Sequence, residues 1–284
     1  MTPTLARQHR PRAGAASRVD RRARARDWAE IQERMLVPLY EAVYERLEVG
    51  PGTRLLGLGC GTGLALLLAA ARGASVTGVD RGARERLALA RERLRVGARG
   101  EHTRILDGSP RDAAPAAGAP GYTLLTAFEP AGHPAGDGTG GPLAERLAQA
   151  TSLAEPGATV VLTGWGPPER CSTSSVLRVA TKLADSADEA GGWRPARRDD
   201  LEDTARRCGL RPDGSGRVSC PFGYADTGSA VRGLLSTGAF DAAIDTTDGE
   251  RVGKELEEAL HPYRRGDGTV WMGNVFRYVV ARVP

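Results

Sequence analysis

A glycine loop directly after a short apolar run constrains the fold of this chain more than any other feature. Residues 55–63 read LLGLGCGTG, and the next apolar run, SVTGVD, ends at Asp80. The glycines Gly59, Gly61 and Gly63 have the spacing G-x-G-x-G. Glycines at this spacing let the backbone turn tightly after a strand and leave no side chains above it. The pattern predicts a ligand that lies against bare backbone.

Two common nucleotide-binding loops do not fit this spacing. A dinucleotide loop requires G-x-G-x-x-G, but Thr62 and Leu64 stand where the third glycine is needed. A P-loop ends in Gly-Lys-Ser/Thr, and no such sequence follows. The loop also opens a helix, whose first N–H groups favour a carboxylate. It therefore suits a flat, uncharged body with an anionic end.

Two aspartates stand at the ends of expected neighbouring strands. Asp80 can accept hydrogen bonds from both hydroxyls of a ribose, or it can simply cap the following helix. Asp107 can accept from an exocyclic amine, although the D-G-S-P sequence that it begins is also a good turn. Together with the loop, these carboxylates describe an adenosine that carries an amino-acid tail and no phosphate.

Strands and helices alternate along the first part of the chain. Apolar runs predict strands at 53–58, 75–79, 103–106, 122–128 and 159–165. Helical spacing predicts helices at 27–48 (divided by Pro38), 64–71, 83–95 and 142–154. This alternation predicts an α/β fold with a parallel sheet and helices on both faces.

The alternation ends after Gly166. We expect helices at 172–190, 198–208, 226–237 and 249–261 and strands at 217–222 and 274–282. The segments 167–205 and 223–270 are expected to cap the ligand face. Their aromatic residues Trp193, Phe222 and Tyr224 can stack on a planar ligand or fill the core. The expected organisation is a disordered basic leader (1–26), a ligand-binding core with N-terminal cap helices (27–166), and capping insertions plus final strands of the same domain (167–284).

The formal charge of +4 is unevenly spread. Residues 1–26 hold eight Arg and one Asp, so the rest of the chain carries a net charge of −3. A mildly acidic folded part argues against a nucleic-acid partner. The arm itself can still touch nucleic acid, but its composition favours a solvated leader.

Cysteine usage and hydropathy exclude further classes. The chain has no C-x-x-C pair and no His at metal-ligand spacing, so we expect no metal site. We expect the cysteines to be reduced thiols and the protein to be cytoplasmic. The longest apolar run, 64–71, is too short to span a bilayer, and the N-terminal segment has no apolar signal core.

Several of these motifs resemble those of a known family. The run LLGLGCGTG…VTGVD resembles motifs I and II of class I S-adenosylmethionine-dependent methyltransferases, and LAERLAQATSLAEPGATVVLTGWG resembles that family's helix, turn and fifth strand. The closing pattern PFGYAD…AVRGLLSTG…GTVWMGNVFRYVVAR is similar to the C-terminal part of an actinobacterial small-molecule branch. The resemblance covers residues 27–284.

The resemblance implies a fold and an activity. The fold is the Rossmann-like class I methyltransferase fold, with a seven-stranded, mostly parallel sheet, an antiparallel last strand and helical cap insertions. The activity is methyl transfer from S-adenosyl-L-methionine to an oxygen or nitrogen of a small-molecule acceptor, with S-adenosyl-L-homocysteine as product. It further implies natural-product (antibiotic) biosynthesis, no membrane or nucleic-acid partner, and a monomer or homodimer.

Site residues follow from the resemblance one by one. It implies that the loop residues Gly59, Cys60, Gly61 and Gly63 line the methionine and ribose. Asp80 holds the ribose hydroxyls, Arg81 lies beside the adenine, and Asp107 and Gly108 frame its edge. Phe128 and Glu129 border the cofactor after the fourth strand, and Trp28 and Gln32 cover its methionine end.

Catalysis mainly requires positioning. Because the sulfonium is already a strong methyl donor, the protein must hold the acceptor atom in line with the S–CH₃ bond. A base is needed only where the acceptor loses a proton. Glu129 and His133, after the fourth strand, are the candidate catalytic residues. Histidine titrates near neutral pH, but a His in such a loop is also compatible with simple solvent exposure.

The chain departs from the family at Gly57, where an Asp or Glu usually stands. That acid commonly organises the glycine loop or reaches the methionine ammonium, so its loss weakens binding unless another group such as Glu129 replaces it. Two alternatives therefore stay open: a cofactor-binding cyclase or isomerase without methyl transfer, and a non-catalytic binding protein. DNA methylation is not predicted, because the fourth strand ends in AFEP.

Overall fold

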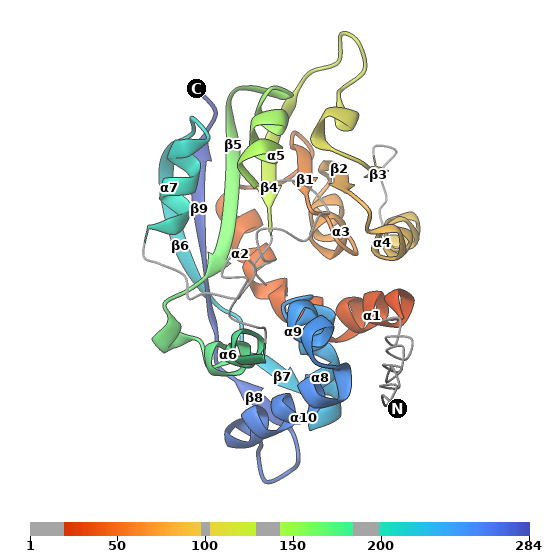
Figure 1. Cartoon of the computed structure of the whole chain (residues 1–284). Helices are drawn as coiled ribbons and strands as arrows, with labels where there is room; N and C mark the ends of the chain where they lie inside the picture. The colour runs from red at the N-terminus through yellow and green to blue at the C-terminus, as the bar shows by residue number, and fades with distance from the viewer. Residues whose placement is uncertain (1–19, 98–102, 129–142, 184–198) are drawn as a thin grey trace, which may run out of the picture.

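The computed structural model describes residues 20–97, 103–128, 143–183 and 199–284, and its centre is a seven-stranded sheet of order β3-β2-β1-β4-β5-β9-β6 (Figure 1). Strands β1 to β5 are parallel, and β9 is antiparallel to both β5 and β6. The strands are β1 (Arg54–Leu58), β2 (Ser75–Asp80), β3 (Thr103–Asp107), β4 (Tyr122–Ala127), β5 (Ala154–Trp165), β6 (Arg211–Ser219) and β9 (Val275–Arg282). The expected fold class is confirmed.

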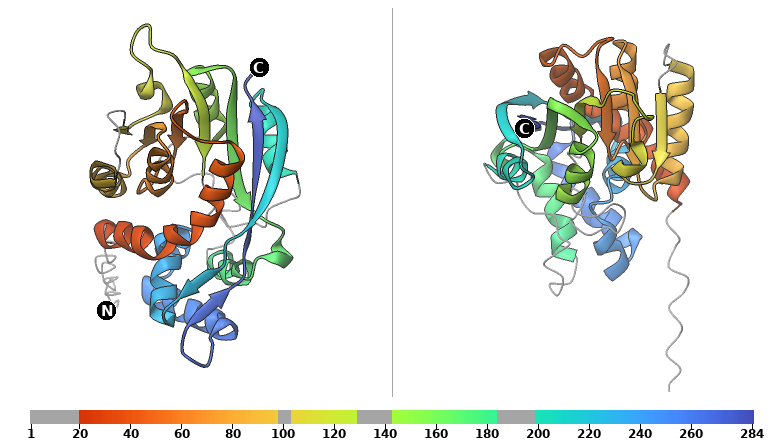
Figure 2. Two further views of the ribbon diagram at one scale, coloured as in Figure 1. Left: turned by 180° about the vertical axis from the view of Figure 1, so that it is seen from behind. Right: turned by 90° about the horizontal axis from the view of Figure 1, so that it is seen from above.

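Helices cover both faces of the sheet (Figure 2). One face carries α2 (Val37–Arg46), α3 (Leu64–Ala71) and α4 (Arg84–Gly97), and the other carries η3 (Pro110–Ala113), α5 (Leu143–Thr151) and α7 (Asp200–Arg207). Alternate residues of β1 serve the two faces: Leu55 belongs to the core beside α3, and Leu56 to the core beside α5. Burial on both faces explains why this strand is a continuous apolar run.

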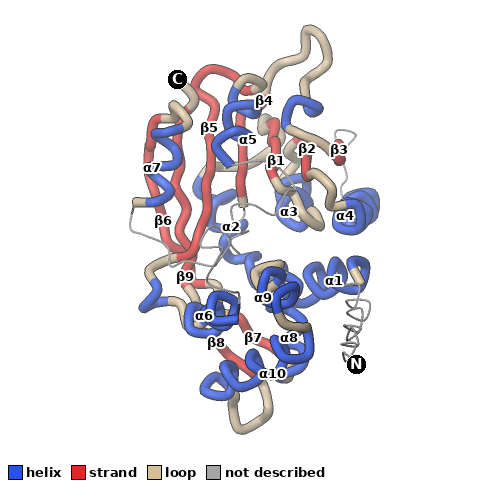
Figure 3. The backbone as a smooth tube through the Cα atoms, viewed as in Figure 1, coloured by secondary structure: helices blue, strands red, loops and turns tan. Residues whose placement is uncertain are grey.

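A second layer, which we call the cap, lies at the carboxyl edge of the parallel strands, below the sheet in Figures 1 and 3. Its helices are α1 (Arg21–Asp27), the π-helical η1 (Trp28–Gln32), α6 (Thr173–Leu183), α8 (Thr227–Ser236), α9 (Asp241–Thr246) and α10 (Gly249–Leu260). Its small sheet pairs β7 (Phe222–Tyr224) with β8 (Val270–Met272). The short helices η2 (Glu33–Leu36), η4 (Pro168–Arg170) and η5 (His261–Tyr263) complete the described elements.

The helix α10 shows how the sequence builds the cap. Asp248 caps it by accepting a hydrogen bond from the Arg251 N–H at 2.7 Å. The buried residues Val252, Leu256 and Leu260 follow one another at four-residue spacing. They form one apolar stripe that packs toward α6 and α8.

The leader is shorter than expected. Helix α1 begins at Arg21, and Asp20 caps it by accepting from the Arg22 and Ala23 N–H groups at 3.0 and 3.1 Å. Arg24 on this helix pairs with Asp241 of the cap at 2.5 Å. The expectation of disorder up to residue 26 is therefore wrong for 21–26, and residues 1–19 lie outside the described ranges.

Two further boundaries differ in the second half. Helix α7 begins inside the expected capping segment 167–205, yet it packs on β5, β6 and β9 of the main sheet. The single strand expected at 217–222 is divided, because Pro221 has no N–H with which to continue the ladder. The residues before this break form β6 and pair with β9, and the residues after it form β7 and pair with β8 in the cap. None of the helices in the described ranges is long and apolar enough to cross a bilayer.

Candidate functional site

The glycine loop joins β1 to α3 at the carboxyl edge of the sheet. Gly59, Gly61 and Gly63 have φ angles of 64°, 53° and 77°, in the left-handed region that residues with a Cβ rarely adopt. The N–H groups of Gly59 and Cys60 both donate to the carbonyl of Val79, at 2.9 and 3.2 Å. These bonds fix the loop against the end of β2.

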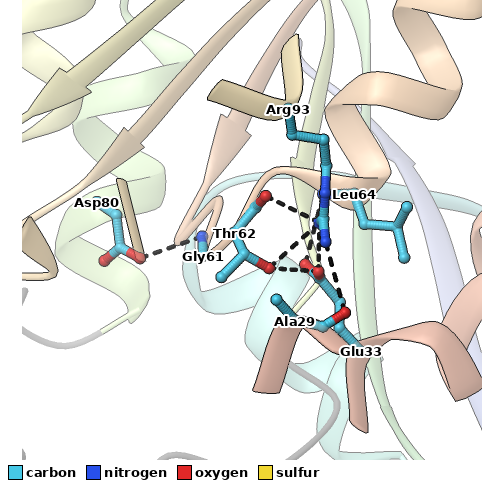
Figure 4. Close-up of polar contacts among 7 residues, drawn as sticks. All are labelled: Ala29, Glu33, Gly61, Thr62, Leu64, Asp80 and Arg93. Carbon is cyan, nitrogen blue, oxygen red and sulfur yellow. Dashed lines mark hydrogen bonds and ion pairs between the residues drawn. The ribbon is translucent and has the colours of Figure 1, made fainter. Parts of the chain in front are cut away.

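Asp80 and Asp107 lie beside each other, as register partners at the ends of β2 and β3. Asp80 Oδ2 accepts from the Gly61 N–H at 3.2 Å (Figure 4). Asp107 Oδ1 accepts from the Gly82 N–H at 2.9 Å, and the Gly108 N–H donates to the Asp80 carbonyl at 3.2 Å. The structure thus brings Asp80 to the loop and places Asp107 and Gly108 next to Asp80. Arg81, between them along the chain, is exposed.

A buried carboxylate behind the loop, Glu33, was not identified by the sequence analysis. Only 3% of Glu33 is exposed. Its Oε2 accepts from the Thr62 hydroxyl and, at 2.7 Å, from Arg93 Nη1, while its Oε1 accepts from the Leu64 N–H at 3.4 Å (Figure 4). Arg93 also donates to the carbonyls of Thr62 and Ala29, at 2.9 and 3.4 Å. This ion pair ties the N-terminal helices, the glycine loop and α4 together.

Glu33 changes two expectations about the loop. The carboxylate at the first N–H of α3 belongs to the protein itself, so this N–H is not left for a ligand's anionic end. In the middle of β1, a Cβ at Gly57 would lie 2.9 Å from Leu66 Cδ2, so an acid there would require the Leu66 side chain to move. Among the described residues, Glu33 and Asp80 both accept hydrogen bonds from the loop or its first helical residue, and Glu33 is supplied from outside the sheet.

The sequence alone gives no clear signal for Glu33, because the burial of its helix face is seen only in the structure. Ala29, Gln32, Glu33 and Leu36 are all buried and have the spacing i, i+3, i+4, i+7 of one helix face. An acid in the middle of a buried face requires a partner, because an unpaired buried charge is costly. The partner, Arg93, lies on α4, 60 residues further along the chain.

Two of the predicted loop residues face the protein. A Cβ at Gly63 would lie 3.0 Å from the Ala90 Cβ on α4, so this glycine permits close helix packing. The Cys60 side chain points at β2, since a Cβ at Gly78 would come within 2.8 Å of its sulfur. Burial raises the pKa of the Cys60 thiol well above its usual range, and the charges of Asp80 and Glu33 add to this. Cys60 therefore stays protonated, and its side chain is no nucleophile.

A comparison of Gly63→Ala with Gly82→Ala separates the energetic cost of backbone strain from that of overpacking. Both glycines have positive φ, 77° and 70°, but a Cβ at Gly82 meets nothing within 4 Å. We expect Gly82→Ala to lower the free energy of unfolding by about 1–2 kcal/mol, through strain alone. Gly63→Ala should lose about 1–3 kcal/mol more, through overpacking against Ala90. Urea unfolding measures both, and equal losses would contradict this packing role.

Trp28 and Gln32 lie where the loop meets the cap. The indole nitrogen of Trp28 is 3.7 Å from the position that a Cβ on Gly61 would take. The guanidinium of Arg86 packs over the Trp28 ring at 5.4 Å and donates to the Ser236 carbonyl at 3.0 Å. Gln32 is buried, and its Oε1 accepts from the Tyr224 hydroxyl at 2.9 Å. Trp28 and Gln32 also line a small cavity between the sheet and the cap.

The remaining predicted residues follow β4. Phe128 packs against Tyr40 and Tyr44 of α2, with ring centroids 4.9 and 5.8 Å apart, so its described contacts are with the core. Glu129 and His133 lie outside the described residues. In the described ranges, no three His, Cys, Asp or Glu side chains gather as metal ligands.

Comparison with known proteins identifies the fold. The searches of family models and of curated proteins gave no match. Among solved structures, a candidate methyltransferase from Bacillus halodurans is similar, with a TM-score of 0.53 and 13% identity, over 86% of this chain and 98% of that one. YjhP from E. coli has a TM-score of 0.52 and 17% identity, over 91% and 98%. A geranyl diphosphate methyltransferase solved with S-adenosylmethionine has a TM-score of 0.50 and 16% identity, over 92% and 90%. The chain therefore has the Rossmann-like methyltransferase fold.

Proposed function

We propose that this chain is an S-adenosylmethionine-dependent methyltransferase that acts on an oxygen or nitrogen of a small molecule. The observation that carries the proposal is the left-handed glycine loop after β1 with Asp80 and Asp107 beside it. Bare backbone and two neighbouring carboxylates are the groups that an adenosine without phosphates requires. The C-terminal resemblance favours a secondary metabolite as the acceptor.

The described residues fit the cofactor. Asp80 would hold the ribose hydroxyls, and Asp107 with Gly108 would receive the adenine edge, with Arg81 beside it. Gly59 and Gly61 would offer bare backbone to the rest of the adenosyl group. A side chain at Gly61 would enter the space between the loop and Trp28, because its Cβ would lie 3.7 Å from the indole nitrogen. A protein of the same fold, the geranyl diphosphate methyltransferase, was solved with this cofactor, which supports the proposal.

The chain's own residues would position the acceptor and exclude water from the site. When bound, S-adenosylmethionine supplies an electrophilic methyl group. Trp28 lies beside Gly61 and also lines the cavity under the cap, so an acceptor bound on the cap side of Trp28 would lie next to the cofactor's methionine end. The cap covers this edge and would exclude water from it. We keep Glu129 and His133 as the proposed bases for an acceptor that must lose a proton.

One observation is also compatible with a second candidate, a cofactor-binding cyclase or isomerase. No titratable side chain is found among the described residues that line the cavity. A pocket without acids or bases suits either an acceptor that needs no base or a rearrangement guided by shape alone.

The test is turnover with S-adenosylmethionine and pooled hydroxyl- and amine-bearing small molecules. Methyl transfer predicts that S-adenosylhomocysteine and a methylated product form in equal amounts. A product of unchanged mass without S-adenosylhomocysteine would contradict methyl transfer and identify the cyclase or isomerase. Cofactor binding without any conversion, across a broad acceptor pool, would leave only the binding protein.

A further inference from the structure

The indole N–H of Trp28 is a buried hydrogen-bond donor for which no described residue supplies an acceptor. Its nitrogen lies 3.7 Å from the position that a Cβ on Gly61 would take, so the donor faces the bare backbone of the glycine loop. A buried donor without an acceptor is costly, and a ligand that brings an acceptor removes this cost. A cofactor group that lies beside Gly61 is therefore expected to accept from Trp28.

The π-helical turn η1 directs both Trp28 and Glu33 at the loop. The Glu33 N–H donates to the Trp28 carbonyl, which is the five-residue hydrogen bond of a π-helix. Trp28 then lies at Gly61, while Glu33 accepts from the Thr62 hydroxyl and from the Leu64 N–H (Figure 4). Because Glu33 takes the first N–H of α3, an anionic group of the cofactor requires a positive charge from another element.

Arg86 of α4 provides a positive charge next to Trp28. Its guanidinium packs over the Trp28 ring, 5.4 Å from the ring centroid, and donates to the Ser236 carbonyl at 3.0 Å. That carbonyl is neutral, and within the described ranges no carboxylate lies at ion-pair distance from Arg86. Asp80 acts on Arg86 from beyond that distance, and Asp241 is paired with another arginine. The charge of Arg86 therefore favours an anion at the edge of the Trp28 ring.

We infer that Trp28 and Arg86 select the carboxylate of the cofactor's methionine tail, which is the only anionic group of the cofactor. The Trp28 N–H donates to a carboxylate oxygen beside Gly61, and the charge of Arg86 attracts the same group from the face of the ring. Arg86 is thus a positioning residue, which also ties the ring to the cap through Ser236. The inference rests on the proposed function, because it concerns the cofactor of that site.

The experiment compares S-adenosylhomocysteine with its decarboxylated analogue, which keeps the nucleoside and the amine and lacks only the carboxylate. Isothermal titration calorimetry on the full chain is expected to show about tenfold or more tighter binding of S-adenosylhomocysteine, the size of one hydrogen bond to a charged group. Trp28→Phe keeps an aromatic ring and removes the N–H. This variant should weaken S-adenosylhomocysteine about tenfold and change the affinity of the analogue by less than about twofold.

Variants of Arg86 separate its charge from its packing. Arg86→Lys keeps a positive charge beside the ring and should keep the preference for the carboxylate within about threefold, whereas Arg86→Gln should lose most of it. Arg95→Gln removes the same charge from an exposed position in the last turn of α4 and should leave the preference unchanged. If Arg86→Gln does not fold, as judged by thermal unfolding, the comparison of Trp28→Phe with the wild-type chain decides.

The outcomes distinguish failure of this inference from failure of the proposed function. Equal affinities of the two ligands in the wild-type chain, or equal losses for both ligands in Trp28→Phe, overturn the inference while the proposed function stands. An equal loss of the preference in Arg86→Gln and Arg95→Gln overturns the role of Arg86. A folded wild-type chain that binds neither ligand overturns the proposed function and this inference with it.

Discussion

Replacement of Asp80 by Ala is expected to weaken S-adenosylhomocysteine binding by about a hundredfold or more, the size of two hydrogen bonds to a charged acceptor. In the structure the carboxylate already accepts from the Gly61 N–H, so it lies against the loop that would hold the sugar. The change would remove the proposed acceptor of both ribose hydroxyls and the loop's hydrogen bond to Gly61. Isothermal titration calorimetry measures the effect.

The control for this prediction is Asp203→Ala. Asp203 is exposed on α7 and pairs only locally, with Arg206 at 3.0 Å, so its loss changes the net charge equally. S-adenosylhomocysteine affinity should then stay within about twofold, because surface pairs of this kind contribute little. An Asp80→Ala protein that folds and binds as tightly as this control would show that the ribose does not lie at Asp80.

Glu33→Gln should be the most destabilising single change near the site. Its loss leaves Arg93 partly buried without its counter-ion, and removal of one partner from a buried pair typically costs about 3–5 kcal/mol of unfolding free energy. Because Glu33 also holds Thr62 and Leu64, the loop should become less ordered, and S-adenosylhomocysteine affinity should fall as well. Urea unfolding and calorimetry measure these two effects.

A surface pair provides the comparison for Glu33. Glu250 and Lys254 on α10 lie 2.8 Å apart, but both side chains are more than two-thirds exposed. Glu250→Gln should cost less than about 1 kcal/mol. The double variant Glu33→Leu/Arg93→Met should recover much of the stability lost by Glu33→Gln, since no uncompensated charge remains. Similar losses in Glu33→Gln and Glu250→Gln would contradict the role of the buried ion pair in holding the loop.

The sequence predicts the first half of the sheet well, and the physical reason is burial. Strands β1, β2, β4 and β5 lie inside the sheet, and their buried central residues are apolar or small and uncharged. The edge strand β6 is different, because its sequence RPDGSGRVS alternates exposed and half-buried residues and contains turn-forming types. Helix α9, with six residues, is too short for helical periodicity to show.

The residues of the candidate site also differ in whether the sequence alone predicts them. Asp80 and Asp107 are predictable because each ends a strand, and parallel strands bring their carboxyl ends together. Glu33 is predictable only with the fold in hand, since its partners Thr62, Leu64 and Arg93 are distant in sequence. Trp28 and Trp165 likewise come from separate layers, so no local sequence pattern brings them to one cavity.

Calorimetric titration of the wild-type chain with S-adenosylhomocysteine, beside a nicotinamide dinucleotide, tests the central claim most directly. The account predicts saturable binding of S-adenosylhomocysteine, one molecule per chain, and no heat from the dinucleotide, because the loop lacks the glycine spacing for a pyrophosphate. Binding of the dinucleotide without binding of S-adenosylhomocysteine would contradict it.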